Sequence, residues 1–343
     1  MTPLHAAIVD EEPMTRVSDA LVRRVNQLYH ELTQDSFDHD HRRRHRAEHE
    51  LWQSVAGMLR RPSGAAARTV ADIGCGTGFV AVLLGDALRP GDHVVAMDVT
   101  EGALRSTAAK WQAAGLHARG PSLRCVLSDV QTLPLADRSV DVVTINAALH
   151  HLPAPETALA EIDRVLRPGG LFALGFEPNH GHFQSSVMRR LAQGLDRACW
   201  YASPRQNRRR IREWLAPSRM APPNRWVGPI NARLLGDGLI AAPLSPRRIL
   251  ELVDPHACGA KNAAGFDPRG LIAGCFSGYE VLLLKFSDYL GESVRQWPLA
   301  RAAADRLFGA LATGRGALFS WIIRKPGLSE SRDAIDVCAW EAT

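Results

Sequence analysis

The sequence predicts an α/β fold in which an open, Rossmann-like, mostly parallel sheet carries helices on both faces. Short apolar runs alternate with helical patterns between about residues 66 and 178, as in consecutive βαβ units. A glycine-rich turn follows the first run, and an acidic residue ends the second. The 46% hydrophobic and 22% charged fractions are those of an ordinary globular chain, and 343 residues allow a core domain with additions.

Residues 1–65 are expected to form an N-terminal helical cover. Leu21, Val25 and Leu28 recur at helical spacing, and the pattern continues to Leu59 beyond a stretch rich in His and Arg. Pro62-Ser-Gly then breaks the helical pattern. The core is therefore expected to begin at about residue 66.

Five apolar runs in the core segment 66–178 have the length of strands and are expected to form the parallel part of the sheet. They are residues 69–73, 93–98, 123–127, 140–146 and 171–176. Right-handed crossovers between them would give an open twisted sheet.

Residues 179–244 depart from this pattern, since Arg, Trp and Pro become frequent. We expect a helical lid inserted into the core, whose aromatic side chains are candidates for lining a pocket: Trp200, Tyr201, Trp214 and Trp226. Residues 245–343 return to the core pattern, with a helix expected at 246–253 and strands at 279–286 and 317–323.

Composition and charge favour a cytoplasmic protein that acts on a small molecule. The net charge of +5 is small for this length, and its arginine clusters at 42–46 and 205–212 alternate with helix-forming residues, as on a solvated helix face. These features argue against a nucleic-acid partner. No apolar run approaches the roughly 20 residues of a membrane-spanning helix, so no membrane insertion is expected. The six cysteines form no C-x-x-C pair and are interpreted as reduced thiols.

The most informative stretch is Asp72-Ile-Gly74-Cys75-Gly76-Thr-Gly78, which joins the first strand to a helix. Its glycines allow a ligand to approach the backbone closely. The dinucleotide fingerprint is G-x-G-x-x-G, whereas the spacing here is G-x-G-x-G. An acid before the turn would repel a pyrophosphate but suits a ligand with an amino group and a sulfonium. The turn therefore favours S-adenosylmethionine (SAM) over NAD.

Asp98 ends the second strand about twenty residues after the glycines, where a carboxylate can accept hydrogen bonds from both hydroxyls of a ribose. Ser128-Asp129-Val130-Gln131, Ser139 to His151 and Leu166-Arg-Pro-Gly-Gly170 follow in order. With these motifs the sequence resembles the class I SAM-dependent methyltransferases, the broad group that includes the ubiquinone and menaquinone C-methyltransferases.

The resemblance implies a seven-stranded sheet that ends in an antiparallel hairpin, and it assigns parts of the cofactor site. An acid at Asp129 binds the adenine amino group and the amide of Val130 reaches the ring. A small residue at Cys75 lines the methionine pocket, so its thiol is interpreted as structural. Val99 and Asn146, which follow the second and fourth strands, are also expected to contact the cofactor.

Candidates for acceptor binding and catalysis follow the fourth and fifth strands, because ligands of open α/β sheets lie at the carboxyl ends of strands. His151 is a candidate general base, and His150 a candidate substrate contact. Glu177 and Asn179 are further candidates for holding an amine or a polar head group. Methyl transfer from an activated sulfonium can also proceed through positioning alone, so a base is not required.

Two other clusters of side chains have less specific patterns. Tyr29 and His30 resemble residues of the cover helices that close the pocket in relatives, although aromatic residues at helical spacing also form cores. The histidines His39, His41, His45 and His49 include helical i, i+4 spacings, but neighbouring arginines oppose a bound cation. We expect no metal requirement.

The leading interpretation is a SAM-dependent methyltransferase for a small-molecule acceptor, with O-, N- and C-methylation, including reactions of secondary metabolism, all open. An alternative enzyme of the same fold cyclises or transfers the aminobutyryl chain and releases methylthioadenosine instead of S-adenosylhomocysteine (SAH). A SAM-binding scaffold is disfavoured by the intact glycine turn and acids. Nucleic-acid methylation is disfavoured because Asn146-Ala-Ala-Leu stands where amino-methylating enzymes have N-P-P-Y.

Overall fold

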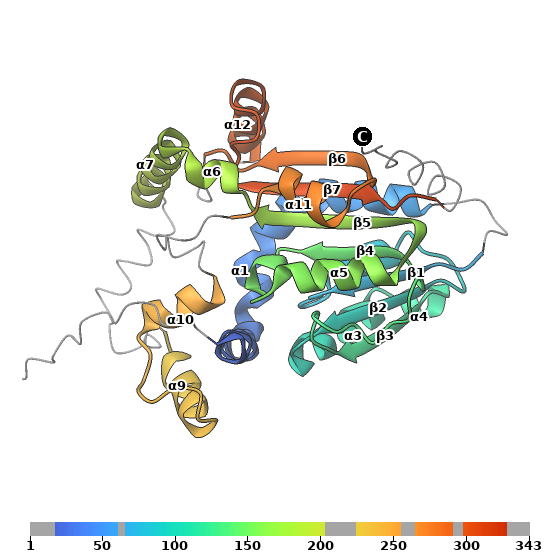
Figure 1. Ribbon diagram of the computed structural model, residues 1–343, viewed down its shortest axis with the longest axis horizontal. Coiled ribbons are helices and arrows are strands. Elements are labelled where there is room, and N and C mark those ends of the chain that lie inside the picture. Colours follow the sequence, from blue (N-terminus) through green and yellow to red (C-terminus); the bar gives the residue numbers. More distant parts are fainter. Residues whose placement is uncertain (1–17, 61–65, 203–223, 255–264, 291–297, 328–343) are drawn as a thin grey trace, which may run out of the picture.

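The computed structural model describes residues 18–60, 66–202, 224–254, 265–290 and 298–327 (Figure 1). Within them a seven-stranded sheet has the order β3-β2-β1-β4-β5-β7-β6. Strands β1 to β5 pair in parallel, whereas β7 runs antiparallel to both β5 and β6. The predicted fold class, a Rossmann-like sheet that ends in an antiparallel pair, is confirmed.

The strands lie where the apolar runs placed them, apart from their ends. They are β1 (Thr69–Ile73), β2 (His93–Asp98), β3 (Ser122–Leu127), β4 (Val140–Asn146), β5 (Leu166–Pro178), β6 (Glu280–Ser287) and β7 (Leu318–Arg324). The largest difference is β5, which was expected only over 171–176. Its first residues read as a Pro-Gly-Gly turn, yet Leu166 pairs with Val140 across a register shift.

Helices cover both faces of the sheet. The helical elements are α1 (Asp19–Leu59), α2 (Phe79–Gly85), α3 (Glu101–Ala113), α4 (Leu116–Arg119), η1 (Leu149–His151), α5 (Pro155–Val165), α6 (His180–Gln184), α7 (Ser186–Ala202), α9 (Val227–Gly236), α10 (Pro246–Val253), α11 (Pro268–Cys275) and α12 (Pro298–Leu311). The strands alternate their buried side chains: Val70 packs toward α1 and α2, and Ala71 packs toward α5 and α11. The buried side chains therefore form two hydrophobic clusters, one on each face of the sheet.

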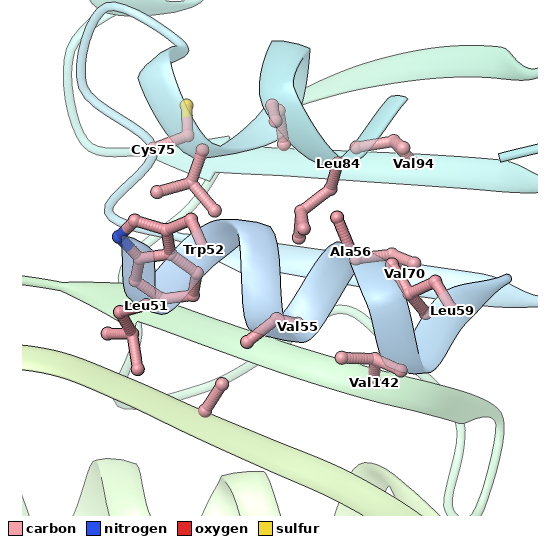
Figure 2. Packing of buried hydrophobic residues seen from close by; sticks show 14 of the residues in the cluster. Leu51, Trp52, Val55, Ala56, Leu59, Val70, Cys75, Leu84, Val94 and Val142 are labelled. Carbon is pink, nitrogen blue, oxygen red and sulfur yellow. The ribbon is translucent and has the colours of Figure 1, made fainter. Parts of the chain in front are cut away.

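Helix α1 runs without a break through the stretch rich in His and Arg. Its second half packs on the sheet, where Leu59 lies beside Val70 and Val55 lies near Val142 (Figure 2). Trp52 lies at the other end of this cluster, on the side of Cys75. The first half of α1 packs on helices α9 and α10 instead of on the sheet. Val25 and Leu28 are buried against α9 and α10, which lie beside the start of α1 in Figure 1.

The described parts of the expected lid occupy two places. Helices α6 and α7 lie near the β6–β7 side of the sheet, close to α12 in Figure 1, whereas α9 packs on α1. Trp226 precedes α9, while the side chains of Trp200, Tyr201 and Trp214 lie outside the described residues. None of the helices in the described ranges combines the length and apolar character needed to span a bilayer.

Candidate functional site

A cavity of about 1360 Å³ opens at the carboxyl ends of β1, β2 and β4, between the sheet and helices α1 and α10. Pockets for a single small ligand usually measure roughly 300–1,000 Å³. This cavity therefore has room for a cofactor and a second molecule. Its position is the one that open α/β sheets use for ligands.

The glycine turn after β1 forms one wall of the cavity. Gly74, Gly76 and Gly78 all have positive φ, at 62°, 52° and 85°. A Cβ on Gly76 would meet no atom within 4 Å, and Gly76 lines the cavity, so this glycine leaves space that a ligand can fill. Gly74 also lines the cavity. Gly78 is not among the lining residues, and its contact with the cofactor stays a prediction; a Cβ there would collide with Thr107 at 2.8 Å, so this glycine allows close packing against α3.

Asp98 is fixed at the end of β2 by three short hydrogen bonds. Its carboxylate accepts from the amide of Gly76 at 2.9 Å and from the amide and hydroxyl of Thr100, both at 2.9 Å. These bonds hold the carboxylate beside the glycine turn, where it lines the cavity together with Val99. All three donors are groups of the protein, so the carboxylate is oriented before any ligand binds.

Asp72 lies at the bottom of the same wall and is only 1% exposed. Its Oδ1 accepts a hydrogen bond from Thr144 Oγ1 at 2.8 Å. Its Oδ2 makes no hydrogen bond of regular geometry with any described residue, although the Ala81 amide lies close enough to affect its charge. Burial raises the pKa of Asp72 to about 7, and the negative charge of Asp98 adds to the shift, while the Thr144 and Ala81 donors oppose it.

A buried carboxylate oxygen that has no regular hydrogen bond among the described residues, and a glycine that leaves open space, fit the amino-acid end of SAM. A cationic donor from a ligand would satisfy Asp72 Oδ2 and lower its pKa. Residues present in this wall therefore suit the cofactor that the sequence predicted.

Asp129 and Val130 lie where an adenine ring was expected. Asp129 accepts from the Gln131 amide at 3.0 Å through Oδ1, and Oδ2 lies 3.1 Å from the Arg23 guanidinium of α1. Leu127 is 55% exposed beside them and lines the cavity, so an apolar face is available to a ring. Sequence reasoning missed Arg23, because only the tertiary fold brings α1 to the end of β3.

Asn146 joins the cavity wall to the second half of α1. Its Oδ1 accepts from Trp52 Nε1 at 3.2 Å, and its Nδ2 donates to Glu48 Oε2 at 2.9 Å. Glu48 is fully buried and lines the cavity. In the sequence, Glu48 is a charged residue within a helical pattern. Periodicity alone does not show whether such a residue is buried or solvated.

Cys75 lines the cavity but has the properties of a structural thiol. It is 8% exposed, and its Sγ lies 3.7 Å from Thr107 Oγ1. Burial, followed by the nearby charges of Asp72 and Asp98, raises the pKa of the Cys75 thiol well above its ordinary value. A thiol kept protonated in this way is a poor nucleophile.

Three imidazole rings meet on the opposite side of the cavity, and all three line it. The ring centroids of His30 and His151 are 5.1 Å apart, and those of His150 and His151 are 4.0 Å apart. His151 Nδ1 lies 2.5 Å from the carbonyl oxygen of Val253, which can only accept, so Nδ1 carries the proton. In the neutral ring the lone pair is then on Nε2, as a general base requires.

Glu177 does not line the cavity, and the prediction that it touches the substrate is corrected. It is fully buried and accepts from the amides of Ala148, Leu149 and His150 at 2.9–3.1 Å and from His150 Nδ1 at 2.8 Å. Phe176, with φ of 58° at a bulge in β5, turns this carboxylate toward η1. Glu177 therefore fixes the segment that carries the two histidines.

Asn179 is likewise placed outside the cavity lining, contrary to the prediction that it contacts the substrate. It is 1% exposed and donates to the carbonyl oxygens of Gly314 and Gly316 at 2.9 and 2.7 Å. Its Oδ1 accepts from the Gly181 amide at the start of α6. Its amide therefore ties the end of β5 to the loop before β7.

Tyr29 lines an apolar part of the cavity with Trp226, and the centroids of the two rings are 5.1 Å apart. Leu239, Leu250 and Val253 complete this part, which lies between the first half of α1 and helices α9 and α10. Trp226 is the lid aromatic that the structure places in the cavity.

Formal charges around the cavity favour a cationic ligand. Five carboxylates and three guanidinium groups line it: Glu48, Asp72, Asp98, Asp129 and Asp254, with Arg23, Arg24 and Arg225. Two of the guanidinium groups pair with acids, Arg23 with Asp129 and Arg24 with Asp237. Within the described residues no cluster of three or more His, Cys, Asp or Glu has the arrangement of a metal site. The side chains of His39, His41 and His45 lie outside the described residues.

Comparison with known proteins finds similarity in the central part of the chain. Residues 71–174 match a family model described as a methyltransferase domain. A 37.1 kDa protein of a Streptomyces fradiae transposon is 36% identical over 108 residues, which are 32% of this chain and 29% of that protein. The demethylmenaquinone methyltransferase of Geobacillus stearothermophilus is 32% identical over 114 residues, 33% of this chain and 47% of the enzyme.

The chain thus spans less than half the length of these two relatives. Among solved structures, a SAM-dependent methyltransferase from Mesorhizobium loti is similar over 80% of this chain and 98% of its own, with 14% identity and a TM-score of 0.42.

Proposed function

We propose that this chain, whose residues 71–174 match a methyltransferase domain, is a class I SAM-dependent methyltransferase that transfers the methyl group of SAM to a small-molecule acceptor. One observation carries the proposal: the glycine turn, Asp72 and Asp98 line one wall of a cavity that also has an apolar part beside histidines. The cofactor wall and the acceptor part open into each other, as a direct transfer requires.

The cofactor wall would hold SAM through groups that are already oriented. Asp98 would accept from the ribose hydroxyls, and Gly76 would leave room for the chain that joins ribose to the amino acid. Asp129 and Val130 would bind the adenine. When bound, SAM supplies an activated methyl group whose sulfonium charge is lost on transfer.

The histidine side of the cavity would act on the acceptor. His151 is held by the Val253 carbonyl so that its Nε2 can take a proton from a hydroxyl or an amine. His150 and His30 pack against His151 and limit its rotation. If the acceptor has no acidic proton, these rings would serve only to position it.

The acceptor is proposed to be apolar over much of its surface, because Tyr29, Trp226 and Leu250 face it. The excess of carboxylates in the lining argues against a nucleic-acid substrate, whose phosphates would be repelled. A metabolite acceptor is therefore proposed, and the cytoplasmic location stays a prediction. Demethylated quinones are reasonable first candidates, since two demethylmenaquinone methyltransferases of Geobacillus are similar over this domain.

The test is mass spectrometry of the purified protein incubated with SAM, with and without an extract of cell metabolites. SAH that accumulates only with extract is expected, and the fractionated extract then identifies the acceptor. Methylthioadenosine that accumulates with SAM alone would contradict methyl transfer and favour cleavage of the aminobutyryl chain. The Asp98→Asn variant is the control for cofactor-dependent turnover.

A further inference from the structure

Two buried carboxylates from different elements face the same end of the cavity. Asp72 belongs to β1 and Glu48 to the second half of α1. Asp72 is 1% exposed and Glu48 is fully buried, and both line the cavity. Only Asp72 is part of the glycine-turn motif, so the sequence pattern gives Glu48 no role.

Two residues of strand β4 hold the two carboxylates. Thr144 donates to Asp72 at 2.8 Å, and Asn146 donates to Glu48 at 2.9 Å. These two strand residues are separated by one residue, so their side chains are on the same face of β4, about 7 Å apart along the strand. The two acids therefore approach neighbouring positions on the same face of the sheet.

Two neighbouring carboxylates suit an ammonium group. Hydrogen bonds from an ammonium to a carboxylate measure about 2.8 Å, and the tetrahedral N–H directions place two accepting oxygens about 4.6 Å apart. Asp72 lines this part of the cavity, and its Oδ2 has no regular hydrogen bond with any described residue. The guanidinium groups of Arg23 and Arg24 do not take this place, because they pair with Asp129 and Asp237.

We propose that Glu48 is a second cofactor-binding carboxylate, which shares with Asp72 the ammonium group of the amino-acid chain of SAM. The inference rests on the proposed function, since it assumes that SAM occupies this wall. It makes the helical cover part of the cofactor site. The anchored half of α1 then recognises the cofactor directly, in addition to packing on the sheet.

The experiment is isothermal titration of two ligands, SAH and its deamino analogue, in which hydrogen replaces the α-amino group. Glu48→Gln keeps an acceptor for Asn146 but removes the charge. We expect it to weaken SAH binding about 10-fold or more and to change binding of the deamino analogue by less than about twofold. Glu50→Gln is the matched control, because Glu50 is on the same helix with a side chain that is 82% exposed. It should change neither affinity.

Several outcomes would overturn the inference. An equal loss of affinity for both ligands would mean that Glu48 only positions α1, and no loss for either would mean that it faces no ligand. A loss for SAM without a loss for SAH would assign Glu48 to the sulfonium. If the unsubstituted protein binds neither SAM nor SAH, the proposed function itself fails.

A second variant keeps the test valid if Glu48→Gln does not fold. In Asp72→Asn the remaining carboxylate should still give SAH a measurable preference over the deamino analogue, because Glu48 is intact. Complete loss of that preference in Asp72→Asn would contradict a role for Glu48 at the ammonium.

Discussion

The two halves of α1 contact the rest of the molecule in different ways. Residues 48–59 pack on the sheet through fully or nearly fully buried side chains such as Trp52, Val55 and Leu59. Residues 19–34 also bury side chains, Val25 and Leu28 among them, but against α9 and α10. We refer to these segments as the anchored half and the covering half.

The covering half reaches the core mainly through polar contacts. Arg23 pairs with Asp129 at 3.1 Å with side-chain exposures of 45% and 37%, and Gln27 donates to the Val99 carbonyl at 3.4 Å. Exposed ion pairs contribute only about 0–1 kcal/mol. One continuous helix therefore joins a rigid wall of the cavity to a cover that costs little to displace.

The largest effect is expected in the anchored half. Trp52→Ala should lower the free energy of unfolding by about 3–5 kcal/mol, because it empties a buried site and removes the donor to Asn146. The indole of Trp52 lies so close to Gly175 of β5 that a Cβ on this glycine would be 2.8 Å from the ring. Urea denaturation measures the loss. Met58→Ala, at a position that is 40% exposed, is the control, and equal effects of both substitutions would refute the anchored packing.

Substitution of Asp72, in the same wall of the cavity, should raise the free energy of unfolding instead of lowering it. Its pKa is raised from 3.8 to about 7 in the folded protein, so ionised Asp72 destabilises the ligand-free fold increasingly as pH rises through this range. Asp72→Asn should therefore be more stable than the parent at about pH 8, by about 1–3 kcal/mol, and should lose most of this advantage at about pH 5. Thermal unfolding at both pH values measures it. A less stable variant at the higher pH would contradict the burial of an unsatisfied charge.

The same carboxylate should make cofactor binding depend on pH. The ammonium of SAH binds the ionised form, so affinity should be full above about pH 7 and fall by up to about tenfold per pH unit below it. Titration calorimetry between about pH 5.5 and 8 measures the slope. The deamino analogue should show a flat profile over this interval. A slope shared by both ligands would implicate the histidines instead of Asp72.

The smallest effect is expected in the covering half. Arg23→Met should change the free energy of unfolding by less than about 1 kcal/mol, because the ion pair is exposed. It should nevertheless speed amide hydrogen exchange in α9 and α10 more than in residues 48–59, since it releases the cover from Asp129. A uniform change along α1 would mean that its halves do not differ in mobility.

Much of the fold was predictable because local patterns determine it. The ends of β1, β2 and β4 and of α10 agree with the expected limits, since apolar runs end at glycines, acids or breakers. The start of β5 was not predictable, because Pro-Gly-Gly reads as a turn and only pairing with β4 extends the strand.

The cofactor wall was predictable from the glycine turn, whereas the roles of Glu177 and Glu48 were not. Glu177 follows a strand and reads as a candidate ligand, but the left-handed Phe176 turns it toward the amides of η1. Glu48 is one of several charged residues on α1, and only the packing of Trp52 on the sheet decides that it is buried. Both roles depend on contacts between residues distant in the sequence.

Titration calorimetry of SAH into the purified protein and into Asp98→Asn tests the central claim most directly. Gly76 donates to one oxygen of the Asp98 carboxylate and Thr100 to the other, so Asn keeps an acceptor for one of these residues while it loses the charge and the second acceptor. We predict saturable binding to one site in the parent and an affinity lower by about 10- to 100-fold in the variant. Absence of binding to the parent, or equal affinity for both proteins, would contradict a SAM site at this wall of the cavity.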